Sequence, residues 1–160
     1  MTADQPTRYM ERTRDYYRAL GYSNDYVWAH FDDVPFARLG KPLSKARIGL
    51  VTTAGPEGGF PRDKNGWRQV WSGDSARQPA RMSTEMAWDR DSTHTDDVGC
   101  YLPIDVVKEL VGEGVVGAIT ARFHCVSNEY SQRKTIEEDA PQVLQRLRDD
   151  GADAAILCPL

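Results

Sequence analysis

Reactive side chains gather between residues 91 and 97. The segment reads Asp-Ser-Thr-His-Thr-Asp-Asp and leads through Pro103 into an expected helix. A carboxylate beside an imidazole orients the ring and raises its basicity, which suits proton transfer near neutral pH. We therefore predict that His94 handles protons, with Asp91 or Asp97 beside it. A polar loop in which His94 and Asp97 serve as caps is an equally good interpretation.

The chain has three cysteines, Cys100, Cys125 and Cys158. Cys125 and Cys158 each come at the end of an apolar run that has the composition of a strand, and Cys125 directly follows His124. A thiol near a histidine and a helix N-terminus has the ingredients for a lowered pKa and a reactive thiolate. Packing of the thiol within an apolar strand is the alternative. Packing fits Cys158 least well, because Pro159 ends its strand and exposes the position.

Metal, disulfide and nucleotide motifs do not fit the sequence. The odd number and wide spacing of the cysteines do not resemble a secreted disulfide framework. A zinc site would need His94, Cys100, His124 and Cys125, whose spacing matches no compact zinc motif, so we expect no metal. The glycines after residue 54 match neither a dinucleotide fingerprint nor a phosphate loop.

Alternating strand and helix signals make up the second half of the chain. Apolar β-branched runs predict strands over residues 46–53, 115–121 and 152–158. Helical spacing of apolar residues predicts helices over 104–113 and from about 135 to 150. Thr135 and Glu138 can form a capping box for the second helix, and Pro141 favours an alternative start nearer Asp139. Helices that alternate with strands in this order are typical of right-handed crossovers on a parallel sheet.

We therefore predict a single α/β domain, with a mostly parallel sheet flanked by helices in a Rossmann-like or flavodoxin-like three-layer arrangement. Residues 1–45 are expected to form a helical and aromatic extension, and residues 46–160 the α/β core. In open α/β sheets, ligands sit at the carboxyl ends of the strands. That edge of the sheet would carry Thr52, Thr53, His124, Cys125 and Cys158.

Composition excludes some partners. The formal net charge of −4 argues against non-specific binding to nucleic acid, which requires a surplus of Lys and Arg. No apolar run reaches the roughly 18–20 residues of a membrane span, and the first ten residues lack an apolar signal core. We expect a cytoplasmic protein without a membrane partner.

Four stretches resemble the glycine/sarcosine/betaine reductase and D-proline reductase family, in particular its selenoprotein B-like subunits. They are residues 47–55, 91–97, 102–117 and 140–160, which are spread along the chain after residue 46. The resemblance implies an α/β domain in an oxidoreductase that reductively cleaves a carbon–nitrogen or related bond. It also implies a selenocysteine or cysteine nucleophile at the end of the last strand.

The resemblance places that nucleophile just after a segment like Ala155–Leu160. We therefore expect that the codon after Leu160 is a UGA that encodes selenocysteine, in which case Cys158 lies beside the nucleophile. If the chain is complete, Cys158 is itself the thiol. We expect no other bound cofactor.

The predicted function is a thiol- or selenol-dependent oxidoreductase that acts on a small molecule and is restored by a thioredoxin-like donor. A homo-oligomer or an assembly with other reductase subunits is expected. The predicted catalytic residues are Cys158, His94 and Asp97. The predicted substrate-binding residues are Thr52, Thr53, Asp91, Ser92, His124 and Cys125. Two alternatives stay open: a non-catalytic subunit that binds a partner protein, and a cysteine-dependent isomerase or racemase.

Overall fold

The computed structural model describes residues 6, 8–25, 27, 29–35, 37–85 and 91–160. The chain divides into two compact units, residues 1–36 and 37–160. In the first unit, helix α1 (Tyr9–Ala19) lies within the predicted helical extension, and none of its residues is buried. The aromatic residues Tyr26, Trp28 and Phe36 of the predicted extension lie outside the described residues.

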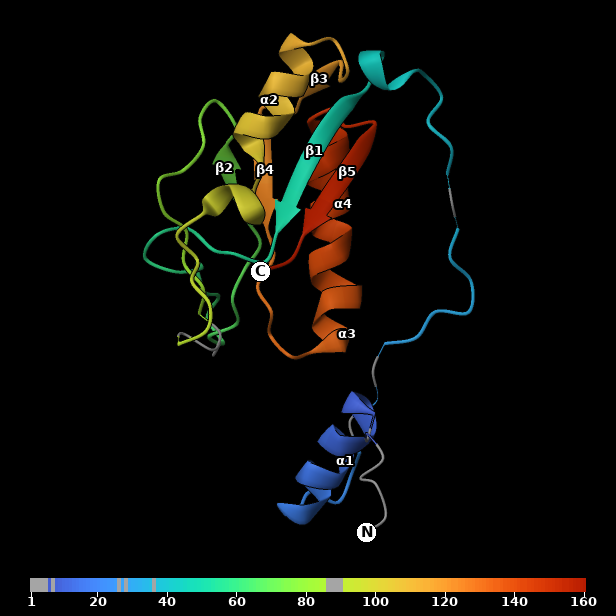
Figure 1. The fold of residues 1–160 in the computed structure, drawn as a ribbon, viewed down its shortest axis with the longest axis vertical. Helices are drawn as coiled ribbons and strands as arrows, with labels where there is room; N and C mark the ends of the chain where they lie inside the picture. The colour runs from blue at the N-terminus through green and yellow to red at the C-terminus, as the bar shows by residue number, and fades with distance from the viewer. Residues whose placement is uncertain (1–5, 7, 26, 28, 36, 86–90) are drawn as a thin grey trace. The chain divides into compact units, whose positions relative to one another are not determined.

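The second unit is built on a five-stranded sheet with β1 (Arg47–Thr52) at its centre (Figure 1). On one edge, β1 pairs in parallel with β5 (Ala154–Cys158) along most of its length. On the other edge, β1 pairs in parallel first with β3 (Ala118–Ile119) and then with β4 (Arg122–Cys125). Strand β2 (Trp71–Asp74) adds to β4 in antiparallel orientation. The predicted mostly parallel α/β sheet is confirmed.

Helices cover both faces of the sheet, as the three-layer prediction requires. The alternation of side chains along β1 places Ile48 and Leu50 in one apolar cluster with residues of α2 (Ile104–Gly112). Val51 lies on the other face, in a second cluster with residues of α4 (Ala140–Asp149). In Figure 1 these two helices lie on opposite sides of the sheet. None of the described helices has the length and apolarity of a membrane span.

Helix α4 begins next to Asp139, at the later of the two predicted starts, and continues from two shorter helical turns. Ser131 caps the short helix α3 (Gln132–Lys134), since its hydroxyl accepts a hydrogen bond from the Lys134 N–H at 3.3 Å. A π-helical turn, η3 (Thr135–Asp139), follows, so that Thr135 lies inside the helical segment. Short 3₁₀ turns also occur at η1 (Leu43–Lys45) and η2 (Val98–Cys100).

The predicted strand over residues 115–121 is wrong in its bounds. Only Ala118 and Ile119 pair there, and a second strand, β4, begins at Arg122. Between them, the Thr120 hydroxyl donates to the Arg122 carbonyl at 2.7 Å, which accompanies a break in the ladder. His124 and Cys125 consequently belong to a strand that pairs on both edges, with β1 and with β2.

Strand β5 is in place but is not the buried strand that its sequence predicts. Its middle residues Ala155, Ile156 and Leu157 are exposed, and both ends are half-buried. Within the described residues, β5 has a strand neighbour on one edge only. This one-sided pairing accounts for the exposure of the middle residues within the described chain.

Candidate functional site

A row of side chains crosses the sheet at the carboxyl end of β1. Thr52 pairs with Cys125 of β4 on one edge and with Cys158 of β5 on the other. Cys125 in turn pairs with Trp71 of β2. Directly paired residues point to the same face of a sheet, so the two thiols flank Thr52 on the face covered by α2. The structure thus brings Thr52, Cys125 and Cys158 together at one edge, as the sequence predicts.

The two thiols of this row cannot form a disulfide in the observed fold. They belong to β4 and β5, with β1 between them. Two strand spacings separate their Cα atoms by about 10 Å, whereas a disulfide requires at most about 7 Å. Cys125 is therefore not a resolving partner for Cys158.

None of the three thiols has the lowered pKa that the sequence suggested. Burial raises the pKa of Cys125 to about 12. Burial also raises the pKa of Cys158. For Cys100, the hydrogen bond to the Asp97 carboxylate raises the pKa, and the charge of Asp97 acts in the same direction. Thiolates at Cys125 and Cys158 are disfavoured because neither gains a cation to offset its desolvation.

The end of β1 and the end of the chain are tied together. The Thr53 hydroxyl accepts a hydrogen bond from the Leu160 N–H at 2.8 Å. The Thr52 hydroxyl accepts one from the Ala54 N–H at 3.2 Å. Residues that follow Cys158 are therefore held beside the two threonines.

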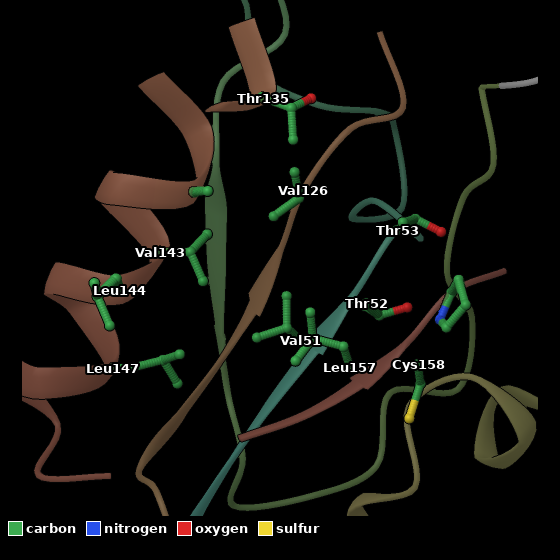
Figure 2. A pocket seen from close by; sticks show the side chains of 12 residues that line it. Val51, Thr52, Thr53, Val126, Thr135, Val143, Leu144, Leu147, Leu157 and Cys158 are labelled. Carbon is green, nitrogen blue, oxygen red and sulfur yellow. The ribbon is translucent and has the colours of Figure 1, made fainter. Parts of the chain in front are cut away.

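An apolar groove of about 440 Å³ opens next to these strand ends. Figure 2 shows Val143, Leu144 and Leu147 of α4 on one side of it, across from Val51 and Leu157 of the sheet. The remaining lining residues include Thr52, Thr53, Val126, Cys158 and Pro159. The groove is suited to apolar groups and offers few polar partners along α4.

His124 does not join the row of thiols. Successive strand residues point to opposite faces, so its ring lies on the α4 side, fully buried. Its Nδ1 is 2.9 Å from the Ser72 hydroxyl, and its Nε2 is 3.4 Å from the Asp150 carboxylate. Burial lowers the pKa of His124 and outweighs the opposing effect of Asp150. The residue predicted to bind substrate thus lies in a buried network beneath α4.

The Ser72–His124–Asp150 network superficially resembles a hydrolase triad. The Ser72 hydroxyl, however, also accepts a hydrogen bond from Arg146 at 2.7 Å. Asp150 accepts further hydrogen bonds from the Arg122 guanidinium, the shortest at 2.7 Å. In a triad the histidine must also pass a proton to the leaving group of the substrate, and the fully buried His124 ring has no access to one. The arrangement instead joins β2, β4 and the end of α4.

The loop at residues 91–97 presents its histidine to solvent. The His94 side chain is 73% exposed, and its Nδ1 lies 3.9 Å from Asp96. Asp97 caps the turn η2, where its carboxylate accepts from the Gly99 N–H at 3.0 Å and from the Cys100 thiol at 3.2 Å. Asp91 and Ser92 form the turn that opens the loop. The catalytic and binding roles of these residues stay predictions.

A charged network that sequence reasoning missed holds the loops around the sheet. Arg68 pairs with Glu85 and, at 2.9 Å, with Glu129. Arg62 adds a second contact to Glu85 at 2.9 Å. Hydrogen bonding from Arg68 lowers the pKa of Glu85. The four residues come from three distant parts of the sequence, which is why no local pattern indicates them. Among the described residues, no cluster of His, Cys, Asp and Glu is arranged to hold a metal ion.

Comparison with known proteins decides the family. Residues 17–159 match the family model described as glycine/sarcosine/betaine reductase selenoprotein B. The chain belongs to this family. The resemblance noted in the sequence is therefore confirmed.

Curated relatives within the reductase family are distant and much longer. The glycine reductase complex component B subunit gamma of Peptoclostridium acidaminophilum is 26% identical over 144 residues, which cover 85% of this chain and 33% of the relative. The corresponding subunit of Symbiobacterium thermophilum is 28% identical over 143 residues, with the same coverage. The D-proline reductase subunit gamma of Acetoanaerobium sticklandii is 31% identical over 62 residues, 38% of this chain and 26% of the relative.

The chain thus spans about a third of the length of the component B relatives it matches. These relatives are named as subunits of reductase complexes. No solved structure matches the chain. For this member of the reductase family, the geometry of the strand ends therefore has to be interpreted from its own residues.

Proposed function

We propose that the chain is a component of a thiol- or selenol-dependent reductase of the glycine/D-proline reductase type. It would reductively cleave a small substrate with electrons from a thioredoxin-like donor. The observation that carries the proposal is the register of Cys158 with Thr52 at the carboxyl edge of parallel strands. Membership in the reductase family supports the reaction class.

The reactive group would be Cys158 or a selenocysteine directly after Leu160, as the family resemblance implies. The hydrogen bond from the Leu160 N–H to Thr53 supports both positions, because a following residue would start beside the same threonines. Thr52 and Thr53 would contact the substrate, and His94 with Asp91 or Asp97 would transfer protons.

A separate electron donor is supported by the spacing of the thiols. Reductive cleavage of a carbon–nitrogen bond consumes two electrons and two protons, which a dithiol supplies as it becomes a disulfide. Cys125 is buried, and β1 lies between its strand and the strand of Cys158, so these two thiols cannot form that disulfide. We propose that the second thiol comes from another molecule, such as a thioredoxin-like protein.

The proposal is tested with protein isolated from its native host, together with any subunits that accompany it. Oxidation of reduced thioredoxin is followed with glycine, sarcosine, betaine and D-proline, the substrates in the names of the family and its relatives. We expect dithiol oxidation that depends on one substrate and is abolished by alkylation of the thiol or selenol at the end of β5. Activity that survives this alkylation would contradict the proposed site.

The position of the nucleophile is tested by the nucleotide sequence. A UGA codon after Leu160, followed by an open reading frame, supports a selenocysteine. A UAA or UAG codon excludes it and assigns the reaction to Cys158. In that case Cys158→Ser should abolish dithiol oxidation, whereas Cys100→Ser should retain it.

A non-catalytic subunit is the second candidate, and one observation favours it. The pKa of each of the three thiols is raised, so none is a ready thiolate near neutral pH. A preparation that binds its partner subunits but oxidises no dithiol would support this function. A cysteine-dependent isomerase or racemase differs from both, because its turnover converts substrate without consuming a dithiol.

A further inference from the structure

The turn η3 departs from the α-helical course on either side of it. The Ala140 N–H donates to the Thr135 carbonyl, five residues back, which is the hydrogen bond of a π-helix. The turn places Thr135 and Ala140 together in the lining of the apolar groove, and Figure 2 shows Thr135 at one end of the groove. π-Helical turns are rare and occur frequently at functional sites. The turn therefore requires a physical cause.

An uninterrupted α-helix would line the groove with a different residue. From Ala140 onwards, the lining residues of α4 recur at the i, i+3, i+4 and i+7 spacing of one α-helical face. Continued backwards by four residues, that face reaches Ile136. In the structure Ile136 is instead 54% exposed. The π-turn thus takes an isoleucine out of the lining and brings in Thr135, which carries a hydroxyl.

A buried ion pair fits the π-turn and does not fit an α-helix. The Lys134 ammonium lies 2.5 Å from the Asp139 carboxylate, and the two side chains are only 5% and 6% exposed. Residues five apart point about 140° away from each other around an α-helix. A π-turn, whose hydrogen bonds join residues five apart, places them on the same face. Formation of the pair therefore requires the π register.

Two features add a cost to the observed conformation. The Oδ2 atom of Asp139 is buried and has no hydrogen-bond partner among the described residues, which is unfavourable for a charged oxygen. Tyr130, in the loop before the helix, has a φ of 53°, in the left-handed region that bulky residues seldom adopt. Backbone outliers of this kind cluster in segments that switch conformation. The ion pair is the interaction specific to the π register that offsets these costs.

We propose that the Lys134–Asp139 pair holds residues 134–140 in the π register, and that loss of the pair shifts this segment to the α register. In the α register, the Ala140 N–H donates to the Ile136 carbonyl, and Ile136 replaces Thr135 in the groove. The pair thereby decides whether a hydroxyl or a branched apolar side chain lines that end of the groove. The inference concerns the shape of the groove and does not depend on the proposed reaction.

Nuclear magnetic resonance of the isotope-labelled 160-residue chain tests the proposal. The through-hydrogen-bond coupling of the Ala140 amide nitrogen should be to the Thr135 carbonyl carbon. Replacement of one partner alone would leave a buried charge unpaired, so the test variant carries both Lys134→Met and Asp139→Asn. In this variant the coupling should move to the Ile136 carbonyl carbon, and a soluble nitroxide should broaden the Ile136 methyl signals less.

A matched control replaces an exposed ion pair on the same helical segment. Arg133 and Glu137 are 3.3 Å apart, and their side chains are 73% and 59% exposed. Arg133→Met with Glu137→Gln makes the same kind of replacement as the test variant. The control should keep the coupling between Ala140 and Thr135.

A deletion separates the register from the ion pair. Removal of Glu137 leaves Lys134 and Asp139 four residues apart, and Thr135 and Ala140 likewise, so an α-helix now brings each pair to one face. The coupling between Ala140 and Thr135 should then persist even when Lys134→Met and Asp139→Asn are added.

Three results would overturn the proposal. The first is a coupling between Ala140 and Thr135 that survives Lys134→Met with Asp139→Asn in the chain of full length. The second is loss of this coupling when the same two replacements are made in the deletion variant. The third is a test variant that does not fold, because the pair would then be required for folding and not for the choice of register.

Discussion

Strands β1 and β5 lie side by side in parallel and have similarly apolar sequences, yet their environments are opposite. Leu50 of β1 is 1% exposed, whereas Ile156, its direct partner in β5, is 42% exposed. β1 has strands on both edges and helices over both faces. β5 has one neighbouring strand within the described chain. An apolar run therefore indicates a strand suited to the interior, and the surrounding chain decides whether it becomes buried.

The largest contrast should appear when a leucine is truncated in each strand. Leu50→Ala removes a buried side chain and should lower the free energy of unfolding by about 3 kcal/mol. Leu157→Ala removes an exposed one and should cost less than about 0.5 kcal/mol. Urea unfolding measures both. Equal losses would show that the two strands are equally buried and would refute the comparison.

The two thiols in the row at Thr52 extend the comparison to reactivity. Iodoacetamide should modify Cys125, which is buried, at least about 100-fold more slowly than Cys158, because modification requires opening of the sheet. Since the pKa of Cys158 is raised, its rate should still increase with pH above about 8.5. Mass spectrometry of labelled peptides measures both rates, and labelling in urea provides the control. A plateau for Cys158 below pH 8 would contradict the raised pKa.

A smaller effect, on the pH dependence of the free energy of unfolding, should come from His124. This residue pairs with Val51, one residue before the row of thiols. Burial holds the pKa of His124 below its ordinary value of about 6.5, despite the nearby Asp150. Below that pH, His124 takes up a proton more readily in the unfolded chain than in the folded one. The contribution of His124 to stability is therefore complete above about pH 6.5 and declines by about 1 kcal/mol as pH falls towards 5.

Replacement tests the assignment of this pH dependence to His124. His124→Gln should flatten the slope of unfolding free energy between pH 5 and 6.5. His94→Gln provides a matched control at an exposed histidine and should keep the slope of the native sequence. A slope that His124→Gln leaves unchanged would contradict the assignment to His124.

Periodicity predicted much of the fold. The helical spacing from Ile104 to Gly112 and the apolar runs at β1 and β5 correspond to observed elements. The break at Thr120 was not predictable from periodicity, because it accompanies one side-chain hydrogen bond to a nearby carbonyl. The antiparallel pairing of β2 was missed as well, since it depends on a distant partner, β4.

The candidate site was predicted in part. Parallel strands end at the same edge of a sheet, which is why Thr52 and Cys158 were expected together. Successive residues of a strand point to opposite faces of the sheet, so His124 and Cys125 must lie on opposite faces once both are placed in one strand. Desolvation of the thiols depends on the folded surroundings, so the raised pKa values could not be derived from the sequence.

The central claim is that the surroundings of the two strands, and not their similarly apolar sequences, decide their burial: β1 pairs on both edges, and β5 pairs on one edge within the described chain. Hydrogen–deuterium exchange of residues 47–52 and 154–158 in the 160-residue chain tests it most directly. We predict strong protection of residues 47–52 and faster exchange of residues 154–158, because amides on the unpaired edge of a strand have no partner in the sheet. Equal protection of the two strands would contradict the claim.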